Sequence, residues 1–222
     1  MHKSPSEMPY NPPPESAAEL LYQDGWLLAF VKASGLLSVP GREAHLKDCA
    51  EHRAKKIDRN ARIVHRLDMD TSGLLLFGKG AEAHRRLSRM FADREVEKRY
   101  IARVLGEVSE ETGEITLPLA ADWPNRPLQK VDEENGKPAR TRWERIAVTD
   151  GTSLLALYPE TGRTHQLRLH LAAIGHPILG DRFYGTEAAR AAASRLQLHA
   201  ERLSFAHPET GEPITLTAAS PF

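Results

Sequence analysis

An aspartate at position 68 stands in a sequence setting that suits catalysis. Arg66 lies two residues before it, the turn residues Thr71-Ser72-Gly73 follow it, and residues 74–77 then form an apolar run. A carboxylate fixed between a cation and a tight turn can act as a nucleophile or a general base. The alternative is structural, because an aspartate before such a turn often accepts backbone N–H bonds. Spacing alone favours the structural role.

Tyr100 and Arg163 are the other residues that could take part in such chemistry. Tyr100 lies in residues 99–105, where polar and apolar residues alternate as they do in a half-buried strand. Taken alone, it is most simply a packed core aromatic whose hydroxyl is hydrogen-bonded. Arg163 lies just before the N-cap of an expected helix, where a guanidinium can bind a carboxylate through two parallel N–H bonds. Taken alone, it is most simply an ordinary surface charge.

Three segments together resemble the motifs of the RluA family of RNA pseudouridine synthases. Residues 65–76 resemble the motif HRLDxxTSGLLL, residues 98–102 resemble K-x-Y-x-A, and residues 162–168 resemble G-R-T-H-Q-L-R. The likeness runs from residue 10 to residue 222 and includes four further segments: 34–41 (SGLLSVPG), 122–127 (DWPNRP), 136–139 (GKPA) and 176–181 (HPILGD). The resemblance implies that Asp68 is the catalytic residue, that Tyr100 packs on the target uracil and takes part in proton transfer, and that Arg163 pairs with Asp68. With the three segments in this order, the catalytic interpretation of Asp68 becomes the favoured one.

The resemblance further implies conversion of uridine to pseudouridine in structured RNA without a cofactor. The target uridine must leave its stack, because the reacting ring and sugar carbon are inaccessible in folded RNA. Asp68 would start cleavage of the C1′–N1 bond by attacking C1′ or C6, or by removing the 2′ proton, and the sequence does not choose among these routes. The implied substrate is a stem-loop shared by 23S rRNA and tRNA anticodon arms. The implied form of the family is the short one, without an S4 RNA-binding domain.

Four residues are expected to contact RNA. Arg66 is expected to fill the space of the flipped-out uridine, because an arginine plane stacks on bases and donates hydrogen bonds along its edge. A salt bridge to a neighbouring acid is the alternative for Arg66. The other three are His65 beside it, and Arg126 and Lys130 in the loop 122–130, for which an ordinary hairpin is the alternative.

Two other functions stay open. The first is a non-catalytic RNA-binding or ribosome-assembly protein on the same fold. The presence of Asp68, Tyr100 and Arg163 argues against it, since a pure binder does not need a buried carboxylate facing anionic RNA. The second is an aspartate-dependent nucleosidase or hydrolase, which would break the same bond but release the base.

Charge and composition argue against a strongly basic protein, a protein with internal disulfides and a membrane-spanning protein. The chain has 30 Lys+Arg and 30 Asp+Glu, so RNA binding would depend on local basic stretches at 53–66 and 85–103, for which solvated helix faces are the alternative. Cys49 is the single cysteine, so no internal disulfide can form and we expect a cytoplasmic protein. No apolar run is long enough to cross a bilayer, and we expect a monomer without membrane contact.

No metal or cofactor is expected. His165 and His170 are five residues apart and do not share a helix face, and Asp68 and Asp70 lack a third carboxylate nearby. The chain also has neither a P-loop nor a G-x-G-x-x-G run, which are the sequence signs of a bound nucleotide cofactor.

Periodicity and turn residues predict the elements that must position these residues. Strands are expected at 20–22, 27–31, 74–78, 99–105, 115–119, 140–148, 154–158, 202–205 and 214–217, and helices at 47–57, 81–91, 164–174 and 186–196. Thr164 is expected to cap the third helix and Gly175 to end it, and Asp150-Gly151 predicts a hairpin turn. Successive strands mostly pair antiparallel, so the expected fold class is α+β: a mixed, mainly antiparallel sheet with flanking helices. The expected domains are a Pro-rich extended arm at 1–18 and one pseudouridine synthase catalytic domain at 19–222.

Overall fold

The computed structural model describes residues 10–222 and places them in two units. The N-terminal unit comprises Tyr10–Lys98 and His199–Pro221, and the central unit comprises Arg99–Leu198 with Phe222. The chain passes from one unit to the other within strands β5 (Glu97–Leu105) and β11 (Leu198–Ala206). The catalytic domain predicted at 19–222 spans both units.

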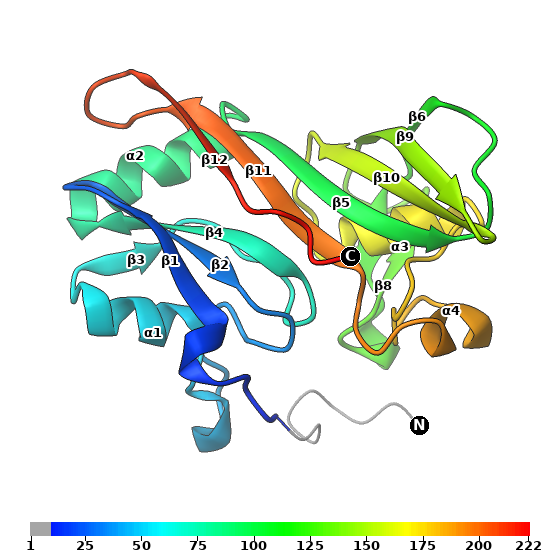
Figure 1. The fold of residues 1–222 in the computed structure, drawn as a ribbon, viewed down its shortest axis with the longest axis horizontal. Helices are drawn as coiled ribbons and strands as arrows, with labels where there is room; N and C mark the ends of the chain where they lie inside the picture. Colours follow the sequence, from blue (N-terminus) through cyan, green and yellow to red (C-terminus); the bar gives the residue numbers. More distant parts are fainter. Residues whose placement is uncertain (1–9) are drawn as a thin grey trace. The chain divides into compact units, whose positions relative to one another are not determined.

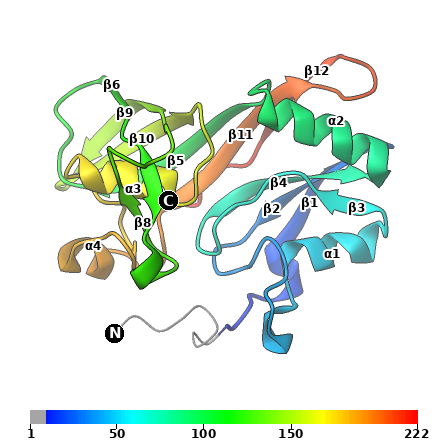
Figure 2. The ribbon, with the colours of Figure 1, turned by 180° about the vertical axis from the view of Figure 1, so that it is seen from behind.

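The N-terminal unit is built on one sheet, which Figures 1 and 2 show from opposite sides. Its strands run in the order β1-β2-β4-β11, with β12 paired to β11 and β3 paired to β4. The bounds not yet given are β1 Ala18–Gln23, β2 Leu27–Lys32, β3 Ala61–Ile63, β4 Ser72–Lys79 and β12 Pro213–Thr217. The pairs are antiparallel except for β4 with β11, where His199 lies opposite Ser72. The sheet is therefore mixed but mainly antiparallel, as predicted.

Strand β4 carries the apolar run that follows the aspartate motif, and it is buried on both faces. Leu74 and Leu76 pack in one core with Leu87 of helix α2 (Gly80–Ala92). On the other face, the rings of Phe77 and Phe30 meet edge to face with centroids 5.6 Å apart. Helix α1 (Ala50–Ile57) and helix α2 lie on either side of β3 in both views (Figures 1 and 2). Burial on both faces makes β4 a rigid support for the loop that precedes it.

Gly73, at the start of β4, is required by close packing of two backbones. Its φ is +112°, and a Cβ there would lie 2.2 Å from the carbonyl oxygen of Ala200 on β11. Only glycine fits both the positive φ and this distance. Gly73 thus allows the parallel contact between β4 and β11.

The central unit has a four-stranded antiparallel sheet in the order β5-β10-β9-β6. A separate two-stranded sheet pairs β7 with β8. The bounds are β6 Thr112–Ile115, β7 Leu119–Ala121, β8 Gln129–Val131, β9 Thr141–Thr149, β10 Thr152–Pro159, α3 Gln166–Ala173 and α4 Glu187–Ala191. Its core joins Leu155 and Leu157 of β10 to Leu167 and Leu171 of α3. Short 3₁₀ turns complete the chain at Glu15–Ala17, Ala44–Leu46 and Trp123–Asn125.

Two turn predictions in the central unit are confirmed. Asp150 and Gly151 have φ of 50° and 70°, and they close the hairpin between β9 and β10 as the left-handed pair that a two-residue turn requires. Gly175 has φ of 86°, its N–H donates to Ala172 O, and the N–H of His176 donates to Leu171 O. This is the Schellman pattern, so Gly175 ends helix α3 as expected.

Four other element predictions need correction. Helix α3 begins at Gln166 rather than residue 164, because His165 takes a left-handed conformation (φ 55°) and becomes the N-cap in place of Thr164. The strand expected at 115–119 is wrong: β6 ends at Ile115 and β7 begins at Leu119, with Pro118 between them. Helix α4 spans Glu187–Ala191 only, and helix α1 begins at Ala50, where Cys49 Sγ accepts from His52 N.

The predicted N-terminal arm lies partly outside the described residues. Of the described part, the Tyr10 hydroxyl donates to Asp48 O at 2.8 Å, and Arg53 donates to the carbonyls of Pro13 and Pro14. Strand β1 begins at Ala18, the last residue assigned to the arm. Residues 10–14 are therefore held against helix α1.

Candidate active site

Asp68 lies in a loop between β3 and β4 whose backbone is tightly held. Its carbonyl accepts the N–H of Thr71 at 3.1 Å, which closes a turn over residues 68–71, whereas Ser72 and Gly73 of the predicted turn already belong to β4. The preceding Leu67 is buried, and the Ser38 side chain both donates to Leu67 O (2.6 Å) and accepts from Leu67 N (3.1 Å). Asp68 itself is half-buried. The loop therefore presents the carboxylate from a fixed backbone.

A second loop, residues 32–38, clamps the motif loop through main-chain contacts. Gly35 N donates to Met69 O at 2.9 Å, and Ser34 Oγ donates to Asp70 O at 2.7 Å. The fully buried Lys32 directs its ammonium group at three carbonyl oxygens, those of Ala33, Leu36 and Met69, at 2.8–2.9 Å. A buried ammonium is stable only when its N–H groups are satisfied in this way. We call Lys32, Ser34 and Ser38 the loop clamp.

His65 is turned toward the protein interior. Its Nε2 accepts the backbone N–H of Leu76 at 3.1 Å, and its ring stacks on Phe91 with centroids 4.4 Å apart. An acceptor Nε2 requires the neutral ring with its proton on Nδ1. Burial, and secondarily the charge of Lys98, lower the pKa of His65 to about 3. His65 thus supports the start of the motif, and its contact with RNA stays a prediction.

Arg66 points to solvent. It is exposed, and it has no hydrogen bond or ion pair with any of residues 10–222. An unneutralised guanidinium beside the aspartate is available to an anionic or aromatic ligand. The salt bridge considered as the alternative role of Arg66 is not formed among those residues.

Tyr100 lies on β5 in the central unit. It pairs across the sheet with Leu157 of β10, and its half-buried side chain packs against the core of that unit. The strand placement predicted from the alternation of residues 99–105 is confirmed. A tyrosine whose strand is paired and whose ring packs against the core has a restricted ring plane, which a stacking or positioning role requires.

Arg163 lies in the loop before helix α3, and a buried glutamine organises that loop. Gln166 Oε1 accepts from Thr161 Oγ1 (2.7 Å) and Arg163 N (3.0 Å), while its Nε2 donates to Arg140 O and Thr141 Oγ1 at 3.0 Å. The exposed side chain of Arg163 donates from Nε to Pro138 O at 3.1 Å. Its backbone is thus fixed, and the remaining guanidinium N–H groups can serve a ligand or a carboxylate.

The same glutamine begins a relay of hydrogen bonds into the core. Thr141 Oγ1 accepts from Gln166 and lies 3.0 Å from His170 Nδ1, and His170 Nε2 lies 2.9 Å from Leu117 O. Since a carbonyl can only accept, His170 carries its proton on Nε2 and accepts from Thr141 at Nδ1. Burial lowers the pKa of His170 and keeps the ring neutral.

A fully buried ion pair holds the other side of helix α3. Arg168 donates from Nε and Nη2 to the two carboxylate oxygens of Asp181 at 2.8 and 2.6 Å. Asp181 Oδ1 also accepts the N–H groups of Phe183 and Tyr184. Burial alone would raise the pKa of Asp181, but the hydrogen bonds and charge of Arg168 lower it overall. Removing either partner would leave an unpaired charge in the core.

The left-handed His165 is tied to the β7–β8 hairpin. Its Nδ1 lies 2.7 Å from the Tyr184 hydroxyl, which accepts the N–H of Gln129 at 2.9 Å. The hydroxyl oxygen thus accepts from β8 and lies within hydrogen-bond distance of His165. A non-glycine residue in this conformation is uncommon and costs energy, and such residues concentrate at functional sites. The strain lies two residues from Arg163.

Arg126 lies in the loop between β7 and β8, and Lys130 lies on β8, so the segment 122–130 forms the hairpin that was the alternative to an RNA-contacting loop. The guanidinium of Arg126 stacks 3.3 Å from the ring centroid of Trp123, which is 68% exposed. Lys130 Nζ lies 3.0 Å from Asp132, which raises the pKa of the lysine. Both contacts with RNA stay predictions, and the exposed Trp123 is a base-stacking candidate that the sequence did not single out.

The predicted site residues thus fall into two groups. His65, Arg66 and Asp68 share the motif loop of the N-terminal unit, whereas Tyr100, Arg126, Lys130 and Arg163 belong to the central unit. The pairing of Arg163 with Asp68 joins the two units and stays a prediction. Sequence reasoning missed the loop clamp and Gln166. The available signal for Lys32 was a lysine that ends an apolar strand directly before a Ser-Gly loop.

Two kinds of feature are absent from the described part of the chain. No three His, Cys, Asp or Glu side chains of residues 10–222 gather as ligands for a metal ion. Among the same residues, no helix has the length and apolar character needed to cross a bilayer.

Comparisons with known proteins agree with the motifs. Residues 27–173 match the family model described as RNA pseudouridylate synthase, and this range includes Asp68, Tyr100 and Arg163. The dual-specificity RNA pseudouridine synthase RluA of Escherichia coli K12 is 50% identical over 214 residues, which cover 96% of this chain and 98% of that protein. RluA of Salmonella typhimurium is 49% identical over 215 residues, with 96% and 98% covered.

Solved structures show the same architecture. Human RNA pseudouridylate synthase domain containing 1 has a TM-score of 0.78 and 27% identity, covering 96% of this chain and 87% of that one. Human RNA pseudouridylate synthase domain containing 4 has a TM-score of 0.74 and 24% identity, covering 91% and 88%, and supports the fold alone. The α+β fold class is confirmed. The family expected from the three motifs is confirmed as well: this chain belongs to the RNA pseudouridylate synthase family.

Proposed function

We propose that Asp68 is the residue with which this enzyme converts uridine to pseudouridine in RNA. Membership of the family supports the reaction. The observation that carries the choice of residue is the motif loop, where the loop clamp holds the backbone on both sides of Asp68. Such preorganisation is what a carboxylate needs to reach one atom of a bound nucleotide.

The reaction needs no external atoms or electrons. The C1′–N1 bond of the uridine breaks, the uracil turns, and a C1′–C5 bond forms. N1 gains a proton and C5 loses one, so the product is an isomer of the substrate. Asp68 starts the cleavage either as a nucleophile or as a base toward the 2′ proton. The reaction thus requires only residues that bind, orient and move protons.

Tyr100 and Arg163 complete the proposed site. Arg163 pairs with Asp68 through two N–H groups and keeps the carboxylate ionised where RNA excludes water. Tyr100 packs its ring against the extruded uracil, and its hydroxyl serves the proton transfer at C5. Arg66 occupies the gap that the uridine leaves, while Arg126 and Lys130 contact the RNA from the β7–β8 hairpin.

The proposed substrate is a stem-loop present in 23S rRNA and in tRNA anticodon arms. The support is the likeness to RluA proteins, which are named dual-specificity RNA pseudouridine synthases. We further propose that the protein acts in the cytoplasm as a monomer. The stacked Trp123 and Arg126 favour recognition of unpaired bases in a loop over that of a regular duplex.

The test is a product assay with the purified protein and a synthetic tRNA anticodon stem-loop. The expected product is pseudouridine within an intact RNA chain. Free uracil with an abasic site would instead identify a nucleosidase. RNA binding without either product would identify a binding protein on the same fold. Mapping pseudouridines in cellular RNA with and without the gene then locates the site.

A further inference from the structure

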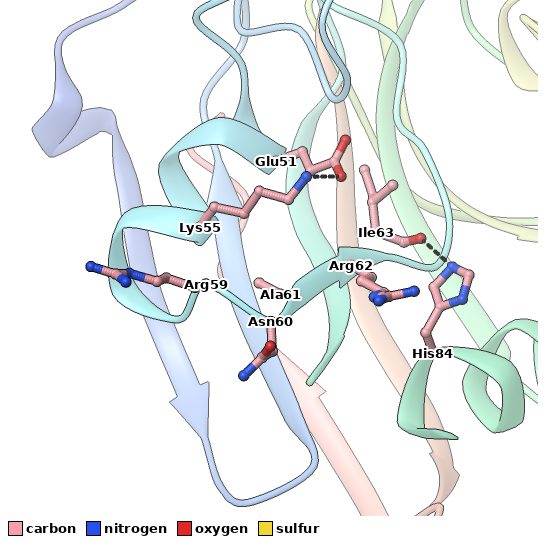
Figure 3. A pocket seen from close by; sticks show the side chains of 8 residues that line it. All are labelled: Glu51, Lys55, Arg59, Asn60, Ala61, Arg62, Ile63 and His84. Carbon is pink, nitrogen blue, oxygen red and sulfur yellow. Dashed lines mark hydrogen bonds and ion pairs between the residues drawn. The ribbon is translucent and has the colours of Figure 1, made fainter. Parts of the chain in front are cut away.

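A groove of about 440 Å³ opens on the N-terminal unit between α1, β3 and α2. Figure 3 shows the eight residues that line it, and none of them belongs to the motif loop at 65–71. They are Glu51 and Lys55 of α1, Arg59 to Ile63 of the following turn and strand, and His84 of α2. Six of the eight lining residues have polar or charged side chains, which suits a polar or charged ligand.

The charge in the groove is positive because its acids are already neutralised. Glu51 pairs with Lys55 at 2.7 Å, and the nearby Asp58 pairs with Lys79 at 3.2 Å. Arg59 and Arg62 are exposed and have no hydrogen bond or ion pair with any of residues 10–222. In Figure 3, Arg62 extends toward His84, while Arg59 extends from the other end of the groove. Two unneutralised guanidinium groups therefore border one concave surface.

The backbone fixes both arginines in this arrangement. Strand β3 pairs with β4 so that Arg62 lies opposite Gly78, between the buried Ala61 and the half-buried Ile63. The turn before it is held by Asn60 N, which donates to Asp58 Oδ1 at 2.8 Å. Ile63 O lies 3.1 Å from His84 Nε2, which joins β3 to α2 and closes that wall of the groove.

We propose that this groove binds a backbone phosphate of the RNA substrate, outside the nucleotide that reacts. The proposal rests on the proposed function. Guanidinium groups bind phosphate oxygens through paired N–H bonds, and such contacts orient RNA without reading its sequence. Arg62 lies six residues before Asp68, so an extended chain separates them by at most about 20 Å. A phosphate held here would fix the register of the strand that delivers the target uridine.

The test is the salt dependence of RNA binding in the double variant Arg59→Gln/Arg62→Gln. Affinity for a synthetic tRNA anticodon stem-loop is measured by fluorescence anisotropy across a series of KCl concentrations. The slope of log Kd against log salt is expected to become shallower by about 1, since loss of one phosphate contact reduces it by nearly one. The single variant Arg62→Lys, with Arg59 unchanged, keeps a positive charge on β3. It should therefore keep most of the wild-type salt slope.

The matched control is Arg202→Gln, which removes an exposed arginine of the same unit that does not line the groove. Its salt slope should equal that of the wild type. An unchanged slope in the double variant would overturn the groove proposal. A second outcome would also overturn it: the wild type binds inorganic phosphate saturably, the double variant does not, and RNA affinity is the same in both. The groove would then bind free phosphate and not RNA. These outcomes are separate from the product assay: pseudouridine formation with an unchanged slope rejects only the groove.

Discussion

At the scale of single residues, the proposal concentrates the chemistry on one carboxylate. We expect Asp68→Asn to lower the turnover number by about 10⁴-fold or more, the size of effect seen when a catalytic nucleophile is removed. The amide keeps the shape of the side chain and removes its charge and basicity. Single-turnover pseudouridine formation measures the loss, while RNA affinity and the thermal midpoint should stay near the wild-type values.

The control for Asp68 is Asp93→Asn, which removes one carboxylate from the exposed end of α2. It changes the net charge equally and should leave turnover unaltered. Near-full turnover in Asp68→Asn would remove the aspartate from the mechanism.

Arg163→Lys tests whether two-point contact matters, since lysine keeps the charge but not the planar pair of donors. Loss of one charge-assisted hydrogen bond costs about 1.5–3 kcal/mol, so turnover should fall roughly 10- to 100-fold. Arg142→Lys, an exposed arginine paired with Glu160 at 2.9 Å, serves as the control. If both variants turn over alike, the pairing of Arg163 with Asp68 is not functional.

His65 makes stability depend on pH. Its pKa is about 3 in the folded protein and near 6.5 when unfolded, so the unfolded chain binds the proton first as the pH falls. The contribution is complete above about pH 6.5 and is lost progressively toward pH 3. His170, whose pKa burial also lowers, acts in the same direction.

We therefore expect His65→Gln to flatten the decline in the free energy of unfolding between pH 6.5 and 4, because glutamine can accept from Leu76 N without titrating. Urea unfolding at a series of pH values measures it. The exposed His45→Gln should retain the wild-type pH profile. An equally steep decline in both variants would mean that His65 does not carry this pH dependence.

At the scale of elements, the loop clamp links fold stability to activity. Lys32→Met fills the same volume but removes the ammonium donor from the carbonyls of Ala33 and Leu36, and Met69 O keeps only the N–H of Gly35. We expect the free energy of unfolding to fall by about 2–4 kcal/mol, because buried acceptors lose their partners although a buried charge is also removed. Turnover should fall too, with Asp68 intact.

Ser38→Ala separates the two effects of the clamp. It removes only the hydroxyl that donates to the carbonyl of Leu67 and accepts from its N–H. The free energy of unfolding should therefore fall by about 1–2 kcal/mol. If turnover in Ser38→Ala and Lys32→Met equals that of the wild type while stability falls, the clamp supports the fold but does not position Asp68.

The elements that sequence could predict are those fixed by local rules. The Asp150-Gly151 hairpin and the Gly175 helix end depend on residues adjacent in sequence and were placed correctly. The loop clamp depends on contacts between residues far apart in sequence, from 29 residues for Ser38 with Leu67 to 37 for Lys32 with Met69. The predicted start of α3 was wrong because the N–H of Arg163 and the hydroxyl of Thr161 donate to the side chain of Gln166 inside the helix, and Thr164 does not act as the cap. Local capping preferences carry no information about such a side chain.

At the scale of the whole molecule, zero net charge does not exclude an RNA-binding protein. The 30 acids balance the 30 bases in sum, but several acids are used in ion pairs while Arg59, Arg62 and Arg66 have no such partner among residues 10–222. We expect RNA affinity to fall with salt as for a basic protein, with a clearly negative slope of log affinity against log salt. An RNA affinity that stays constant from about 50 to about 300 mM KCl would exclude a surface that contacts phosphates.

The close approach at Gly73 separates what the fold needs from what the reaction needs. Without a side chain at that position the β4 and β11 backbones can meet, and this demand holds whether or not uridine is ever converted. A pseudoenzyme descended from this scaffold would keep the Ser-Gly pair and the leucines that follow, and a signature search would still return it. Under the proposed mechanism, the residue at position 68 would distinguish the active enzyme from such inactive relatives.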